Sequence, residues 1–87
     1  RLLATTAELT WPAIAQAGGT QEQTIFLNEA LVGDGVVVIP PAGLVAGLVF
    51  SGYVKSTNTV AVKCINVTGA AITPARANWT VKIVKEA

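Results

Sequence analysis

The sequence predicts an all-β domain, either an antiparallel β-sandwich or a jelly-roll-like barrel of about six short strands. In several segments apolar residues alternate with polar ones, which is the spacing of a strand with one buried face. Glycine, proline and asparagine separate these segments at short intervals, as turns require. No stretch repeats apolar residues at helical spacing over a dozen positions, so the helix content should be near zero. A chain of 87 residues has room for one such core.

The N-terminal part of the chain carries the weakest strand pattern. Residues 7–11 predict a first strand that Pro12 closes, and the flexible Gly18-Gly19 pair follows. We therefore expect an N-terminal arm over residues 1–19, with a first strand in it, and a β-sandwich domain over residues 20–87. Within the sandwich, residues 20–28 predict a strand that begins polar and ends apolar.

The middle of the chain contains one short, unbroken apolar run. Val36–Ile39 follows the turn sequence Gly33-Asp34-Gly35, and Pro40-Pro41 then removes two successive backbone donors and ends the strand. Because every residue of the run is apolar, we expect it to be in contact on both faces. Residues 41–47 contain two glycines and a proline, which favours a loop.

Two segments joined by a hairpin come next. Residues 48–55 are rich in aromatic and β-branched residues, and the polar sequence 56–58 that follows predicts a turn. Residues 59–65 then alternate, with Lys63 on the face opposite to the predicted core positions. Those core positions are Val60, Val62 and Cys64.

The C-terminal segment repeats the alternating pattern. One face of the predicted strand carries Trp79, Val81 and Ile83. The opposite face carries Thr80, Lys82 and Glu86. This segment and residues 59–65 are the two best-defined strands in the sequence.

Composition excludes several classes of partner. Hydrophobic residues make up 52% of the chain and the mean hydropathy is +0.57, more than so small a domain can easily bury, so we expect apolar surface to meet another chain. No apolar run approaches the roughly 18–20 residues of a membrane-spanning helix, so no membrane partner is expected. The net charge of +1 comes from scattered residues, which argues against nucleic acid.

Catalytic residue patterns are scarce, and we expect no enzyme activity. The chain has no histidine, which excludes Ser-His-Asp and Cys-His arrangements and His-containing zinc sites. The single cysteine, Cys64, allows no internal disulfide and is expected to be a buried thiol. Glu22, Glu29 and Asp34 are loosely clustered acids, but a polar strand start and a tight turn account for them better than an acid pair. A small hydrolase is the remote alternative, and no metal or cofactor is expected.

Two further patterns have ordinary explanations. Asn66-Val67-Thr68 and Asn78-Trp79-Thr80 match the N-x-[ST] glycosylation pattern, which arises often by chance. Four aromatic residues have the flat rings that stack on sugars, although core or interface positions are the more common role in a small domain. They are Trp11, Phe50, Tyr53 and Trp79.

The stretch from residue 33 to residue 84 resembles a small module found in tailed bacteriophages and prophages. The residues that carry the resemblance are Asp34, Pro40-Pro41, Gly47, Gly52-Tyr53-Val54, Asn58-Thr59-Val60, Asn66, Gly69-Ala70-Ala71-Ile72, Pro74 and Trp79-Thr80-Val81. Modules of this kind are similar to head-decoration or fibre-associated domains, which are β-rich and often trimeric. The resemblance offers no catalytic motif, and the N-terminal part of the chain matches the module poorly.

The resemblance implies a virion structural protein that decorates or cements a phage capsid. The expected partners are the major capsid protein and further copies of the chain, with a homotrimer favoured, at the capsid surface of the virion. The alternative is an interaction module of a tail fibre or spike that binds glycans. The N-terminal segment over residues 1–12 is the expected docking arm, reaching a neighbouring subunit or the capsid shell, because it is terminal and precedes a flexible glycine pair. Its candidate interface residues are Leu2, Leu3, Leu9 and Trp11.

Overall fold

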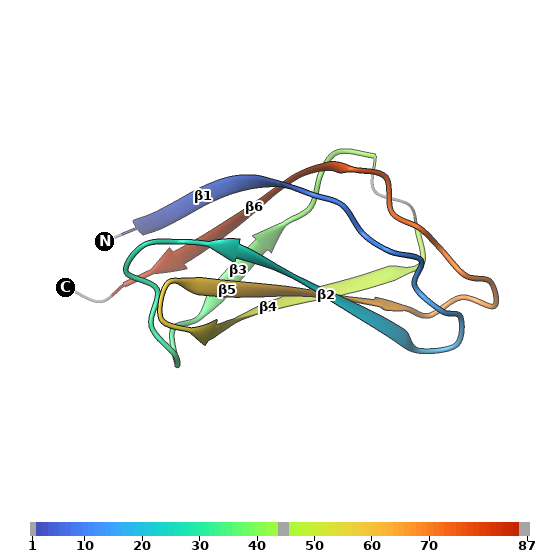
Figure 1. The fold of residues 1–87 in the computed structure, drawn as a ribbon, viewed down its shortest axis with the longest axis horizontal. Coiled ribbons are helices and arrows are strands. Elements are labelled where there is room, and N and C mark those ends of the chain that lie inside the picture. The colour runs from blue at the N-terminus through green and yellow to red at the C-terminus, as the bar shows by residue number, and fades with distance from the viewer. Residues whose placement is uncertain (1, 44–45, 86–87) are drawn as a thin grey trace.

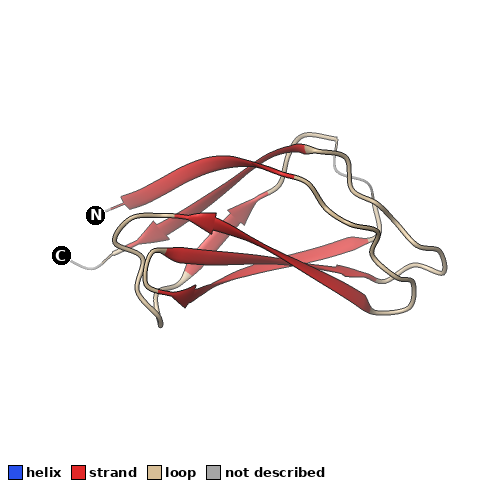
Figure 2. Cartoon of the chain, viewed as in Figure 1, coloured by secondary structure: helices blue, strands red, loops and turns tan. Residues whose placement is uncertain are grey.

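The computed structural model describes residues 2–43 and 46–85, and these contain strands and loops but no helix (Figure 1, Figure 2). The strands are β1 (Leu2–Leu9), β2 (Gly19–Phe26), β3 (Val36–Ile39), β4 (Leu48–Ser56), β5 (Thr59–Asn66) and β6 (Ala77–Val84). They form two antiparallel sheets of three strands, in the orders β1-β6-β3 and β2-β5-β4. The predicted all-β class is confirmed, and of the two arrangements expected the chain adopts the sandwich.

The two central strands, β5 and β6, are those that the sequence predicted best. Val60, Val62 and Cys64 are fully buried on the inner face of β5, and Lys63 lies on its outer face. In β6 the predicted core residues are likewise fully buried, whereas Thr80 and Lys82 are partly exposed. Glu86, assigned to the same outer face from the sequence, lies outside the described residues. Each central strand is paired on both edges, which is why its buried face is so regular.

The first strand differs from its prediction. It runs over Leu2–Leu9 rather than residues 7–11, and it pairs with β6 along its whole length, from Leu2 opposite Val84 to Leu9 opposite Ala77. Residues on both faces of β1 are small or apolar, so the sequence alone showed little alternation there. The N-terminal segment is therefore an edge strand of the first sheet rather than an arm separate from the sandwich.

The core is centred on Trp79, which is fully buried in β6. The Trp11 ring lies 5.6 Å from the Trp79 ring between centroids, at a tilted angle, and the Phe50 ring lies 5.7 Å away, edge to face. These are favourable aromatic geometries. Because Phe50 belongs to β4 and Trp79 to β6, this contact joins the two sheets.

Gly52 allows the two sheets to approach each other closely along one side of the sandwich. A Cβ atom at this position would lie 2.6 Å from a methyl group of Val38 and 2.9 Å from one of Val36. No side chain fits at such distances, so the lack of one lets β4 lie against β3. The strands β1 and β2 border the opposite side (Figure 1).

The loops at the end of the sandwich where β1 begins and β6 ends are held by the β4–β5 hairpin. The predicted turn at 56–58 is present, with Asn58 at a positive φ of 65°, a conformation that asparagine tolerates well. The backbone N–H groups of Leu27 and Glu29 donate to Asn58, whose own N–H donates to the carbonyl of Ala30. The loop expected over residues 41–47 also lacks strand or helix in its described part, since residues 44 and 45 lie outside the described residues.

Candidate interaction surface

The four interface residues predicted in the N-terminal segment have different environments. Leu9 and Trp11 are buried, with exposed fractions of 6% and 3%, and belong to the core of their own chain. Leu3 is partly buried and packs against that core. Leu2 is exposed, at 58%, on the outer face of the first sheet. The apolar character of the segment thus serves folding more than docking, and only Leu2 keeps a clear surface role.

The candidate reactive groups do not assemble into one site. Glu22 lies in the middle of β2, whereas Glu29 and Asp34 belong to the loop after β2. Asp34 forms an ion pair with Lys85 at 2.6 Å and accepts a hydrogen bond from the N–H of Leu31, which together lower the pKa of its carboxyl. This is the turn role that its glycine neighbours predicted.

The Cys64 thiol is held in its protonated form. Its side chain is fully buried on the inner face of β5, and burial raises its pKa to about 11. A thiol with so high a pKa contains very little of the nucleophilic thiolate at neutral pH. Its prediction as a buried core residue is confirmed.

The two N-x-[ST] asparagines also have opposite environments. Asn66 is fully buried at the end of β5, and its side-chain amide is hydrogen-bonded to the backbone of Ile14 and Ala70 and to Thr68. Asn78 is exposed on the outer face of β6. The first asparagine therefore ties together the loops at one end of the sandwich, and its amide is inaccessible in the folded chain.

The aromatic residues considered as a sugar platform are split between core and surface. Trp11 and Trp79 are buried, and Phe50 packs against the core that contains them. These three therefore have the core position that was one of the two roles, core or interface, expected for the set. Tyr53 instead lies on the outer face of the β2-β5-β4 sheet, 44% exposed. Phe26, which the sequence did not single out, is on the same outer face and is 69% exposed.

The outer face of the β1-β6-β3 sheet carries four exposed aliphatic side chains, which we call the aliphatic face: Leu2, Val37, Ile39 and Val84. Leu2 and Val84 are direct cross-strand neighbours, and Val37 lies opposite Lys82. Their exposed fractions range from 40% for Ile39 to 72% for Val84. The unbroken run at 36–39 predicted contacts on both faces of β3. In the structure its outer residues, Val37 and Ile39, face solvent, so the expected contact on the second face of β3 is not made within the chain.

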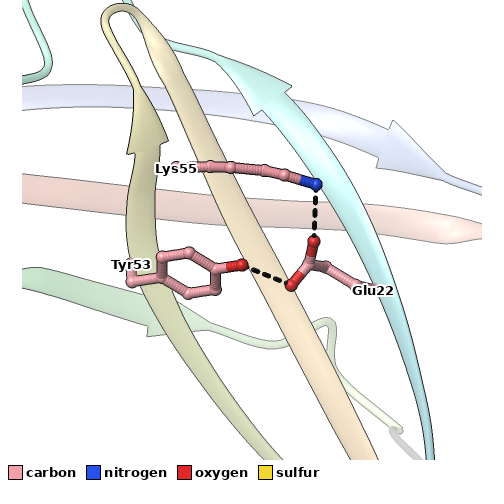
Figure 3. Close-up of polar contacts among 3 residues, drawn as sticks. All are labelled: Glu22, Tyr53 and Lys55. Carbon is pink, nitrogen blue, oxygen red and sulfur yellow. Dashed lines mark hydrogen bonds and ion pairs between the residues drawn. The ribbon is translucent and has the colours of Figure 1, made fainter. Parts of the chain in front are cut away.

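A polar cluster lies on the outer face of the other sheet (Figure 3). The Tyr53 hydroxyl donates to Glu22 Oε1 at 2.7 Å, and Lys55 Nζ donates to Oε2 at 3.1 Å. Tyr53 and Lys55 come from β4 and Glu22 from β2, so the contacts span the central strand β5 (Figure 3). Ala61 of β5 has no long side chain to block this span, and it is fully buried. Glu22 was expected to be only a solvated residue. In the structure its carboxylate links the two edge strands of the sheet, β2 and β4.

These contacts shift the three pKa values in the directions that stabilise the ionised pair. The hydrogen bond from Tyr53, followed by that from Lys55, lowers the pKa of Glu22. The bond to Glu22 in turn raises the pKa of Tyr53 and that of Lys55. Tyr53 is therefore a neutral donor at physiological pH, suited to holding a carboxylate in place rather than to proton abstraction.

We predict that this cluster makes stability depend on pH. The folded-state pKa of Glu22 lies below its ordinary value of 4.5, so its contribution is fully present above that pH and is lost as the pH falls through the lowered value. Replacing Glu22 with Gln should lower the urea midpoint slightly at pH 7, because the groups are largely solvent-exposed. Below the lowered pKa the midpoints of wild type and Glu22→Gln should converge. A difference that persists undiminished at low pH would contradict the role of the carboxylate.

Comparisons with known proteins give no relative for this chain: no family model, curated protein or solved structure matches it. Within residues 2–43 and 46–85, no helix is long and apolar enough to cross a membrane. Over the same residues, no three or more Cys, Asp or Glu side chains gather in a potential metal site. The outer faces of the two sheets are therefore the candidate interaction surfaces of the described chain.

Proposed function

We propose that this chain is a structural subunit that binds the outside of a bacteriophage capsid through its aliphatic face. The observation that carries the proposal is the set of exposed aliphatic side chains on one sheet: Leu2 and Val84 are direct neighbours, and β3 adds Val37 and Ile39 on the same face. The resemblance of residues 33–84 to phage modules supplies the type of particle. The major capsid protein is the proposed partner, and the capsid surface the proposed location.

The physical basis for docking is the burial of apolar area on a preformed surface. Each square ångström of apolar surface removed from water contributes about 25 cal/mol. Strand residues held by cross-strand pairs lose little further conformational freedom on binding, so less of this gain is offset. On the aliphatic face, Val37 and Val84 are the most informative positions to change, because both are more than half exposed and support little of the core.

The second candidate function is glycan binding at a tail fibre or spike. It is favoured by the outer face of the β2-β5-β4 sheet, where exposed Phe26 and Tyr53 lie near the charged groups of Glu22 and Lys55. Aromatic rings stack on the apolar faces of sugars, and fixed charges can bind their hydroxyl groups. Specific binding on a glycan array, lost in Tyr53→Ala, would support this function over the first.

The decisive experiment locates the chain on purified particles of the phage that encodes it. Cryo-electron microscopy should show it as density on the capsid shell, with the aliphatic face toward the shell. Density at the tail would support the glycan-binding alternative. Absence of the chain from the particles would overturn both virion roles.

Variants test which face docks. Val37→Lys and Val84→Lys should each weaken binding to particles that lack the chain by about tenfold or more, because each would bury an unpaired charge; at position 37 the new lysine lies opposite Lys82, which cannot neutralise it. Val49→Lys is the matched control, since Val49 is 52% exposed on the opposite sheet. Equal loss of binding in all three variants would contradict a specific role for the aliphatic face.

A further inference from the structure

The sandwich has four edge strands, and an edge strand exposes backbone N–H and C=O groups that can pair with another chain. In the described part of the chain the edges are β1 and β3 in one sheet and β2 and β4 in the other. Proteins commonly block such edges with short strands, prolines, bulges or charges. The four edges differ in how well they are blocked in these ways.

The edges of β3 and β4 are blocked. The strand β3 has only four residues, is followed by Pro40-Pro41, and lies against Gly52 of β4. The strand β4 has an irregularity in its pairing between Val54 and Ser56, where Lys55 is inserted. Such a bulge twists an edge away from regular pairing.

The edge of β2 is blocked by polar side chains in its middle. Glu22 lies at the centre of the outer face, while Gln21 and Gln23, on the inner face, are only partly buried. Pairing of two β2 strands about Glu22 would place two carboxylates opposite each other, which is destabilising. A shifted register would separate the carboxylates, but it would still place Gln21 and Gln23 at the junction between the two copies of the chain.

Apart from Glu8 near one end, which forms an ion pair with Arg76, the edge of β1 has none of these features. It is eight residues long, follows β6 in register throughout, and contains no proline, lysine or arginine. Its middle consists of Ala4, Thr5, Thr6 and Ala7, which are small enough to allow close approach of another strand. Its single charged residue, Glu8, lies near one end.

We propose that two copies of this chain associate through β1, with the two strands antiparallel about a two-fold axis. The pairing would join the two β1-β6-β3 sheets into one continuous sheet. Residues opposite each other must lie on the same face of that sheet, so the axis passes through a residue and not between two residues. Thr5 and Thr6 are the middle residues of β1, and an axis through either of them gives the longest pairing. Only the residue on the axis then lies opposite its own counterpart in the second copy.

The position of Glu8 favours a second copy of the chain as the partner and an antiparallel direction for the pairing. With Thr5 at the axis, the two Glu8 residues are six positions apart along the pair, about 20 Å at the spacing of a strand. A parallel pair in register would place them side by side and would be disfavoured by like charge. Antiparallel pairing of β1 with itself therefore separates the charges and places small residues at the centre.

Symmetry distinguishes this dimer from the trimer expected from the resemblance. A closed trimer built by edge pairing needs β1 to bind a different edge strand of the next copy, because the contact is heterologous. The other three edges are those blocked by shortness, a bulge or polar groups. A two-fold contact uses only β1, and it leaves the aliphatic face exposed on both copies. The inference is independent of the virion role, since it concerns the isolated protein.

Light scattering on the size-exclusion peak of the isolated chain tests the proposal. At micromolar concentration the molar mass should be twice the 8.9 kDa of one chain. Thr5→Lys, which directs a charge inward at the open edge, should halve that mass. Gln23→Lys is the matched control, because it makes the same change at a partly buried inner position of β2, and it should leave the dimer intact.

Cysteine cross-linking provides a second measurement that does not depend on the stability of the lysine variant. Cys64 is fully buried, so a cysteine placed at Thr5 or Thr6 would be the accessible thiol. Under mild oxidation one of these two variants should form a disulfide-linked dimer, and Gln23→Cys should not. A monomeric or trimeric wild type, a dimer lost only in Gln23→Lys, or cross-linking only through residue 23 would each overturn the proposal.

Discussion

Replacing Trp79 with alanine is expected to lower the free energy of unfolding by about 3–5 kcal/mol, as large aromatic deletions in cores do. The Trp79 side chain is fully buried, and it contacts the rings of Trp11 and Phe50. A domain of this length has a total stability of roughly 4–13 kcal/mol. The variant should therefore lose at least about a quarter of the total stability of the domain. Chemical denaturation followed by far-ultraviolet circular dichroism measures the change.

Trp11→Phe is the matched control for the Trp79 prediction. Trp11 is also buried, and its indole N–H, like that of Trp79, has no hydrogen-bond partner. Phenylalanine keeps an aromatic ring beside Trp79 and removes the unpaired donor, which offsets part of the lost packing. We expect a cost below about 1.5 kcal/mol. A Trp79→Ala variant no less stable than Trp11→Phe would contradict the central position of Trp79 in the core.

The parts of the fold that the sequence predicted well are those in which one strand face alone is buried. In β6 the core residues Trp79 and Val81 flank the more polar Thr80, and the strand is paired on both edges. In such a strand the alternation of apolar and polar residues shows directly which side chains are buried, so the sequence pattern was sufficient to predict them. The hairpin at Asn58 was predictable for a similar reason, because a tight turn selects its residues locally.

The first strand could not be located in the same way. Leu2 and Leu3 face opposite sides of the sheet, so hydrophobicity does not distinguish inner from outer residues at its start. What sets the bounds of β1 is its pairing with β6, which lies more than sixty positions away in the sequence. Such pairing depends on tertiary structure, and local patterns contain little information about it.

The candidate surfaces were predictable only in part. The apolar run at 36–39 indicated a second contact for β3, and Val37 and Ile39 are indeed on the outer face. The cluster around Glu22 was missed, because its partner Tyr53 lies 31 positions away and the two meet only through the register of three strands. Contacts across a sheet are set by register, which the sequence leaves open.

The two sheets offer different chemistry on their outer faces. The β1-β6-β3 sheet presents aliphatic side chains such as Val37 and Val84, which suit docking on another protein. The β2-β5-β4 sheet also has exposed apolar side chains, Phe26 and Val49, and in addition carries the cluster of Tyr53 with the Glu22–Lys55 ion pair. In the proposed docking mode the first sheet contacts the partner and this cluster faces solvent.

Asn66→Ala is expected to cost roughly 3 kcal/mol of stability, because it removes four hydrogen bonds made by a fully buried side chain and leaves the backbone N–H of Thr68 without its partner. The Asn66 Nδ2 group donates to the carbonyl oxygens of Ile14 and Ala70 at 3.0 and 2.8 Å. Its Oδ1 atom accepts from the N–H of Thr68 at 2.9 Å and from the Thr68 hydroxyl. Alanine can make none of these bonds, and it also leaves a small cavity. The urea midpoint at neutral pH measures the loss.

The other N-x-[ST] asparagine supplies the control. Asn78 has the same side chain but is exposed, so Asn78→Ala should change stability by no more than about 0.5 kcal/mol. Hydrogen exchange should further distinguish the Asn66→Ala variant from Asn78→Ala. Loss of the Asn66 amide should reduce protection first at the N–H groups of Ile14 and Ile72, which pair the two loops that it joins. Equal effects of the two substitutions would mean that the buried amide does not hold these loops, and that the paired backbone of Ile14 and Ile72 is sufficient to close this end of the sandwich.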